Sequence, residues 1–494
     1  SNITGIETIN VNQSTTLTGT LNTTAVHIAT GTTLTADASV VSAKVINNLT
    51  TNGTVAVTNL QGTLAADLST ITTTTIGATW SGSSATFTGN LGNASLAVTG
   101  GVMTTTDEIL SGHTVTGSGA LIVNVDSDLA FNWSNINSTV NETVNFSAGM
   151  TYAQNLSSAD ALTLASGVTV DISGATINGA ITTSVTGAAG SESLTLNSSF
   201  LHATSSIDLA ASADTLAITS NTALSAADFG KIHGVETLNL TNYTGTADLT
   251  STDVNEITTL QTGSNVNSIT IDYAMNVTDT GGTDTLTLAA NSIDLSGKTI
   301  TGIETLALGA TTGTTLNATE ASSMNITGSG TNAFSISDSG GADSVNLASD
   351  LSGFSGTFSF NGGTGNDNMT LDFTKLGSLT MDGGADTDTL ALSGLSGSHI
   401  TAANMSNISN VETVDISSID LSSASLTIDF NALWNLGLTS DLAQTGGYNT
   451  INLDVLGTDT TNLSIAGMTS PAFITTTGAY DITDGTNTLH MIVA

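Results

Sequence analysis

A short unit of turn and strand recurs along this chain at a nearly constant interval. Its copies begin near residues 190, 211, 234, 281, 302, 340, 362 and 383. Adjacent copies are mostly 21 to 23 residues apart, and missing copies account for the wider gaps. A repeat of this length is typical of a solenoid, in which each unit forms one turn of a coil and covers the core of the next. A narrow composition is the alternative explanation, but the regular spacing favours a solenoid.

Two motifs make up the repeat, and each places an acidic residue just before an apolar alternation. The motif G/N-I/V-E-T-apolar begins at Gly5, Gly234, Gly302 and Asn410, and the motif G-G-x-D-x-apolar at Gly281 and Gly340, with weaker copies around Glu192 and Asp214. Period-two alternation bounded by turn residues predicts strands. Stacked turns lie about 4.8 Å apart. The acids would therefore form a column that repels itself unless cations lie within it.

The two best-preserved copies are nine-residue stretches, 362–370 and 383–391. The first matches the calcium-binding nonapeptide G-G-x-G-x-D-x-U-x at every specified position, and the second has Asp386 in place of the third glycine. Glycines allow tight turns with carbonyl oxygens pointing inward, and calcium prefers carboxylate and carbonyl ligands. We predict that Asp367 and Asp388 ligate calcium and that Asp386 bridges to a neighbouring ion. Backbone oxygens near Gly363, Gly365 and Gly384 would complete the shell.

Other acidic turns are weaker candidates for calcium. Asp284 and Asp343 follow Gly-Gly pairs, but when the motif is aligned from its glycines, Leu286 and Val345 take the later Asp position. A turn cap is an equal alternative there. Asp126 and Asp128 form another acidic pair, for which a solvated turn is favoured.

The charge of the chain restricts its partners. There are 41 acidic residues against four lysines and no arginine, a net charge of -37. Nucleic acid is excluded because its phosphates need basic side chains, and anionic membrane surfaces are disfavoured for the same reason. Cations are the expected partners. Cysteine is absent, so stability is expected to come from packing, sheet hydrogen bonds and metal.

Catalytic patterns are not found in the sequence. There is no H-E-x-x-H zinc helix and no G-x-S-x-G nucleophile elbow, and the six histidines are scattered. We therefore predict that the chain is not an enzyme. The predicted fold is all-β: an elongated parallel β-solenoid or β-roll with calcium-binding turns, plus flanking β domains. The expected parts are a Thr/Asn-rich β domain at 1–185 (solenoid or sandwich), the calcium-binding solenoid at 186–420, and a C-terminal β domain at 421–494.

These repeats resemble the RTX (repeats-in-toxin) group, and within it the crystalline surface-layer (S-layer) proteins of Gram-negative bacteria. The resemblance rests on 362–370, 383–391, the turns at Gly281 and Gly340, and the interleaved Glu-Thr motifs. It covers about residues 190–420. It implies secretion as an unfolded chain, folding on extracellular calcium, and calcium-dependent self-assembly at the cell surface. The nonapeptides here are one per turn rather than contiguous, which implies one calcium-lined edge with fewer ions.

The resulting functional hypothesis is a secreted structural protein, a subunit of a lattice or filament whose folding and contacts depend on calcium. Its partners would be further copies of itself, calcium ions and, as a candidate anchor, a cell-surface polysaccharide. One alternative is an adhesin or ligand-binding stalk that recognises glycans or ice. Another is a secreted enzyme carrying a repeat-containing tail.

Overall fold

The structure is a computed structural model of the 494-residue chain. It describes residues 6–127, 131, 133–137, 139–156, 159–176, 184–220, 222–251, 255–266, 268–309, 312–337, 340–394, 399–401, 403–416, 426–429, 448–455, 463–466, 478–483 and 488–493. Strands make up 44% of it and helices 9%, and the strands form a parallel β-solenoid of about 18 turns. The predicted all-β solenoid is thus confirmed. The chain divides into two compact units, 1–244 with 251–257, and 245–250 with 258–494.

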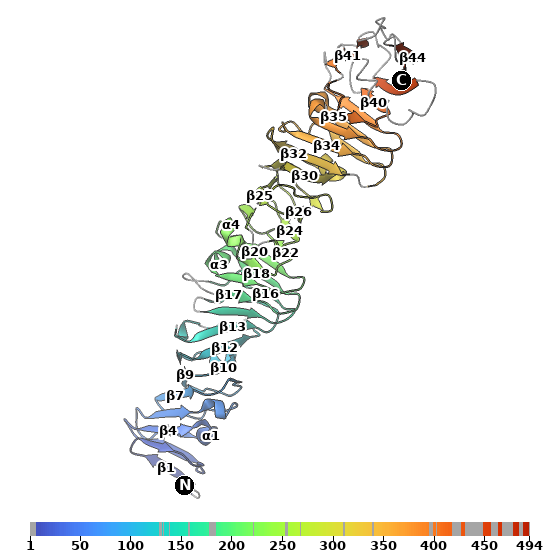
Figure 1. The fold of residues 1–494 in the computed structure, drawn as a ribbon. Helices are drawn as coiled ribbons and strands as arrows, with labels where there is room; N and C mark the ends of the chain where they lie inside the picture. The colour runs from blue at the N-terminus through green and yellow to red at the C-terminus, as the bar shows by residue number, and fades with distance from the viewer. Residues whose placement is uncertain are drawn as a thin grey trace. The chain divides into compact units, whose positions relative to one another are not determined.

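The strands of the first unit lie in four parallel ladders (Figure 1). The first ladder contains β1 (Thr8–Val11), β3 (Ala25–Ile28) and β5 (Ile46–Asn48), and the second contains β2 (Thr15–Leu17), β4 (Thr33–Asp37), β6 (Thr54–Thr58), β7 (Thr75–Trp80), β9 (Ser95–Val98) and β11 (Val115–Gly117). The third ladder contains β8 (Ala85–Thr86), β10 (Val102–Thr106), β12 (Ala120–Val125), β13 (Asn141–Phe146), β15 (Ala161–Leu164), β17 (Ser184–Thr186), β19 (Ser206–Asp208) and β21 (Ile232–His233). The fourth contains β14 (Met150–Thr151), β16 (Thr169–Asp171), β18 (Ser193–Asn197), β20 (Thr215–Thr219) and β22 (Thr237–Asn239).

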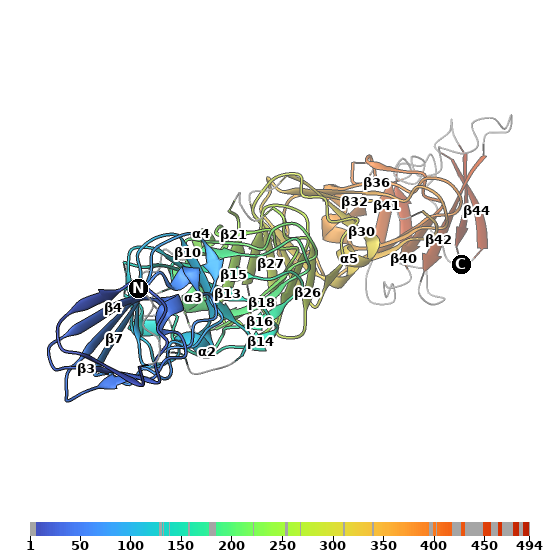
Figure 2. The same cartoon turned by 90° about the horizontal axis from the view of Figure 1, so that it is seen from below.

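The strands of the second unit lie in five ladders, which Figure 2 shows from another side. One ladder contains β23 (Thr246–Leu249), β25 (Ser268–Ile271), β27 (Thr285–Leu288), β29 (Thr305–Leu308) and β31 (Asn325–Gly328), and another contains β24 (Thr259–Thr262), β26 (Asn276–Asp279) and β28 (Ile300–Thr301). A third contains β30 (Thr312–Asn317), β32 (Ala333–Ser337), β34 (Thr357–Asn361), β36 (Leu379–Asp382) and β39 (Ile408–Ser409). The fourth contains β33 (Ser344–Leu347), β35 (Asn368–Asp372), β37 (Thr389–Ser393), β40 (Thr413–Ile416), β42 (Tyr448–Val455), β45 (Thr488–Val493) and β44 (Gly478–Thr483), and the fifth contains β38 (His399–Ile400), β41 (Leu426–Asp429) and β43 (Leu463–Ala466).

Successive strands of the chain mostly belong to different ladders, because each turn of the coil passes from one face to another. Every strand pair found among the described part of residues 1–185 is parallel. This is the pairing of a solenoid, whereas sandwich sheets are antiparallel. In the second unit, β42 extends the parallel ladder from β40, and β44 pairs with β45 in the antiparallel sense.

Helices are short and lie between strands. They are α1 (Ala38–Val41), η1 (Leu60–Gly62), α2 (Asp107–Leu110), η2 (Trp133–Asn135), α3 (Ser198–Ala203), α4 (Ala226–Phe229), α5 (Ala318–Ser323) and η3 (Phe373–Ser378). None of the helices in the described ranges is long and apolar enough to span a membrane.

The core consists of stacks of apolar side chains at equivalent positions of successive turns. Two such stacks are Leu194, Leu216 and Leu238, and Met369, Leu390 and Val414. Met369 and Leu390 are the apolar residues of the two nonapeptides, and both are fully buried. Burying a side chain of this size stabilises the fold by about 1.5–3 kcal/mol. The alternation seen in the sequence therefore becomes one buried side chain at every second strand position.

Candidate functional site

An acidic residue directly precedes one strand in many turns, and parallel pairing places these acids at the same corner. In the second unit, the paired strands β33, β35, β37 and β40 begin at the same level. Their first residues are Ser344, Asn368, Thr389 and Thr413, which lie opposite one another in the pairing register. The residues just before them are Asp343, Asp367, Asp388 and Glu412. We call these four residues the acid ladder of the second unit. The predicted column of carboxylates is therefore present.

Three carboxylates of this ladder, those of Asp367, Asp388 and Glu412, accept a hydrogen bond from the backbone of the preceding turn. The N–H of Asp343 donates to Oδ1 of Asp367 at 2.7 Å, and the N–H of Asp367 donates to Oδ1 of Asp388 at 2.8 Å. The N–H of Asp388 donates in turn to Oε2 of Glu412 at 2.8 Å. Charge-assisted bonds of this kind are stronger than neutral ones. The ladder thus joins adjacent turns at the corner, just outside the strand ladder.

The first unit contains a corresponding acid ladder. The N–H of Glu192 donates to Oδ1 of Asp214 at 2.6 Å, and the N–H of Asp214 donates to Oε2 of Glu236 at 2.8 Å. A carboxylate oxygen of Glu192 accepts the N–H of Gly167 at 2.8 Å. The recurring acid of both sequence motifs therefore has a backbone-pairing role, independent of any metal.

Burial makes the charged form of the Asp388 carboxylate unfavourable. It raises the pKa of Asp388 above its usual range, and Glu412, Asp386 and Asp382 raise it further, while the hydrogen bond from the backbone of Asp367 opposes the rise. Oδ2 of Asp388 is buried and has no hydrogen-bond partner. Such an oxygen is costly unless a proton or a cation compensates it.

The predicted metal-binding glycines adopt the backbone conformation that the nonapeptide requires. Gly363, Gly365 and Gly384 have φ of 77°, 114° and 103°, and Asp386 keeps a positive φ of 85° at the place of the third glycine. The exposed carboxylate of Asp386 accepts the N–H of Gly365 at 3.2 Å. Asp386 therefore links the two nonapeptide turns directly.

Oxygen atoms converge in the small space beside the first glycine of each nonapeptide. A Cβ on Gly362 would lie 2.2 Å from the carbonyl oxygen of Gly383 and 2.5 Å from Oδ2 of Asp367. A Cβ on Gly383 would lie 1.8 Å from the carbonyl oxygen of Asn410 and 2.7 Å from Oδ2 of Asp388. A carbonyl and a carboxylate oxygen thus face the same space in both turns, and this donor set fits a hard cation such as calcium.

Asp284 lies at the corresponding corner of another pair of turns, just before β27. Its N–H donates to Oε2 of Glu304 at 2.7 Å, and both of its own carboxylate oxygens are buried without a hydrogen-bond partner. Burial, with Asp279 and Glu304 nearby, raises the pKa of Asp284 to about 6. Asp343, the other weaker candidate, belongs to the acid ladder itself. Both residues are thus equivalents of Asp367, each two positions before a buried apolar residue.

Other acidic residues come together where the sequence motifs gave no signal. Among the described residues, the one place where three potential side-chain ligands lie within 4.8 Å of one another is Asp107, Glu108 and Asp126 in the first unit. Asp128, the other member of the acidic pair with Asp126, lies outside the described residues. Glu412 belongs to the motif that begins at Asn410, so the predicted column of acids includes it. Acids about one turn apart at strand ends are the sequence signal for the cluster, but only the strand pairing shows that its members meet.

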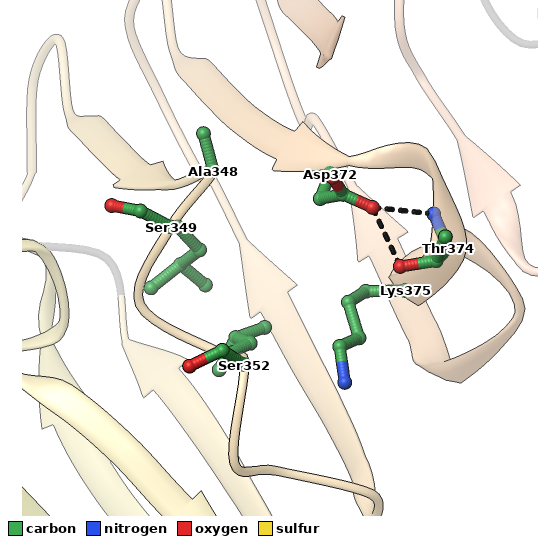
Figure 3. Close-up of a pocket in the computed structure, with 8 residues that line it drawn as sticks. Ala348, Ser349, Ser352, Asp372, Thr374 and Lys375 are labelled. Carbon is green, nitrogen blue, oxygen red and sulfur yellow. Dashed lines mark hydrogen bonds between the residues drawn. The ribbon is translucent and has the colours of Figure 1, made fainter. Parts of the chain in front are cut away.

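The hollow in Figure 3 lies between two turns of the second unit and is lined by Ala348, Ser349, Ser352, Asp372, Thr374 and Lys375. Asp372 accepts hydrogen bonds from the backbone N–H and the hydroxyl of Thr374 at 2.9 and 2.5 Å. Nζ of Lys375 donates to the carbonyl of Phe354 at 2.5 Å. These polar groups cap η3 and tie it to its neighbour, so their role here is structural.

Comparison of the chain with protein-family models, with curated proteins and with solved structures found no match. The resemblance drawn from the repeats therefore stays a prediction.

Proposed function

We propose that this chain is a secreted structural protein of the cell surface, a lattice or filament subunit that assembles with copies of itself when calcium binds to its turns. The observation that carries the proposal is the repeated pair of oxygens beside Gly362 and Gly383, one carbonyl and one carboxylate in each of two successive turns. Calcium would be held there by Asp367, Asp388 and neighbouring backbone oxygens. When bound, it supplies positive charge between buried carboxylates and holds adjacent turns together.

Charge balance supports a role for cations. The net charge of -37 includes only four basic residues, and of these Lys231 is already paired with Asp228 at 3.0 Å. A compact fold with such an excess of one sign repels both itself and its copies. Cation binding at the corners would lower both repulsions at once, which links calcium to folding and to assembly.

The test compares the assembly state of the purified full chain in calcium, in magnesium and in EDTA. Light scattering and electron microscopy measure this state. We expect sheets or filaments in calcium and dispersed chains in the other two solutions. Addition of EDTA to the assemblies should disperse them. Dispersed monomers in all three solutions would contradict assembly and favour the adhesin or ligand-binding stalk instead.

A matched pair of variants separates the turns from general charge effects. Asp388→Asn removes a proposed ligand, and Asp67→Asn removes one charge from an aspartate whose Oδ1 accepts the N–H and hydroxyl of Ser69. Assembly should need more calcium in Asp388→Asn and the same calcium as the unmodified chain in Asp67→Asn. Equal calcium requirements in both variants would contradict a role for the turns.

A further inference from the structure

We infer that Asp107, Glu108 and Asp126 form a calcium-binding site in the first unit, outside the nonapeptide turns. The site does not rest on the proposed function, since an ion can bind there whether or not the chain assembles. It lies where two neighbouring strands of one parallel ladder end.

Strand pairing brings the three residues together. β10 and β12 pair in parallel, with Thr106 opposite Asn124. Asp107 and Glu108 directly follow β10, and Asp126 directly follows β12. The parallel register therefore places all three at the same edge of the ladder. Their carboxylate oxygens lie within 4.8 Å of one another.

The side chain of Asp107 is the observation that distinguishes this place from an ordinary acidic patch. Asp107 is 0% exposed, and neither of its carboxylate oxygens has a hydrogen-bond partner. A buried carboxylate without a partner is costly, and the two acidic neighbours add repulsion. A bound cation would compensate all three charges.

The surrounding groups arrange the other two carboxylates for the same ion. Glu108 and Asp126 are exposed, which leaves the outer side open to water ligands. The hydroxyl of Ser127 donates to Oε1 of Glu108 at 2.7 Å and fixes that side chain.

The ligand set favours calcium over magnesium and over softer metals. The three carboxylate oxygens lie within 4.8 Å of one another, close enough to face one ion. Calcium accepts several carboxylates in a flexible shell of about six to eight oxygens, whereas magnesium usually keeps several waters and binds through one or two carboxylates. An all-carboxylate set is also the choice of hard cations rather than zinc or copper.

The test is equilibrium dialysis of the full chain against radioactive calcium in excess magnesium. Glu108→Gln and Asp126→Asn change exposed side chains and are not expected to disturb the core, and Asp107→Asn changes the buried one. Each should bind one calcium ion fewer, or bind that ion at least about tenfold more weakly. Asp67→Asn, a half-buried aspartate of the same unit outside the cluster, should bind calcium like the unmodified chain.

Equal calcium stoichiometry and affinity in the unmodified chain, Glu108→Gln and Asp126→Asn would overturn the site, even if Asp107→Asn fails to fold. A chain carrying both Glu108→Gln and Asp388→Asn separates this inference from the proposed function. Loss of an ion from Glu108→Gln alone supports the site here, and loss from Asp388→Asn alone supports the nonapeptide turns only. Loss of two ions from the double variant supports both.

Discussion

The backbone N–H of Asp367 donates a hydrogen bond to Oδ1 of Asp388, which lies 21 residues later in the chain, at a distance of 2.8 Å. The two residues occupy the same position in successive turns, and the bond closes the corner between β35 and β37. The same relationship joins Asp343 to Asp367. Acidic residues at this corner are therefore structural before any metal is considered.

Replacing Asp388 separates its backbone role from its charge. Asp388→Ala removes the acceptor of the Asp367 N–H and should lower the free energy of unfolding in EDTA by about 1–3 kcal/mol. Asp388→Asn keeps a side-chain carbonyl oxygen at this place and should cost less. Denaturant unfolding of both variants without calcium measures the difference. Equal losses for Ala and Asn would show that the acceptor does not matter.

Gly383 is required by the close approach of the next turn. A Cβ there would lie 1.8 Å from the carbonyl oxygen of Asn410, so Gly383→Ala must displace backbone. We expect a loss of about 1–3 kcal/mol in the free energy of unfolding, as for overpacked cores. Gly377→Ala is the matched control, because a Cβ at Gly377 would meet nothing within 4 Å. A similar loss in both variants would contradict the steric explanation.

Glu320 should make the second unit less stable as pH rises. It is 3% exposed, and burial raises its pKa from 4.5 to about 7. The folded chain thus holds this proton more tightly than the unfolded chain does. The stability that the neutral form contributes is fully present below about pH 4.5. It is lost as pH rises through about 7, by about 3 kcal/mol in total.

The variant Glu320→Gln removes this titration and keeps an oxygen to accept the N–H of Asn317, which bonds Oε2 of Glu320 at 3.1 Å. The free energy of unfolding is measured for both proteins at pH 5 and pH 8. Relative to the unmodified chain, Glu320→Gln should be more stable at pH 8 than at pH 5. Parallel pH curves for the two proteins would contradict the assignment of the pH dependence to Glu320.

Spacing in the sequence was enough to predict the solenoid and the acid column, because parallel stacking converts a constant repeat into a constant position. Asp343 shows where this reasoning was incomplete. Counted from its Gly-Gly pair, it falls two residues short of the position of Asp367. Counted from the strand, it occupies the same position, since Ser344 pairs with Asn368. The strand, rather than the glycines, sets the register, and the turn before it varies in length.

The partners of the carboxylates could not be predicted in the same way. A sequence shows that Asp388 recurs but not that its oxygen accepts the N–H of Asp367, since that depends on the direction of a side chain across turns. The cluster of Asp107, Glu108 and Asp126 has no glycine motif, and its members meet only because β10 and β12 are in register. Such sites require the strand pairing to be known first.

The central claim, that calcium binds the turns at 362–367 and 383–388, is tested most directly by amide hydrogen exchange of the full chain in calcium and in EDTA. At a thousandfold excess over Kd, calcium that binds only the folded turns adds about 4 kcal/mol. The amides of Asp367 and Asp388 should then exchange about a thousandfold more slowly in calcium, and Asp388→Asn should lose most of this protection. Equal exchange rates at these amides in calcium and in EDTA would contradict the claim.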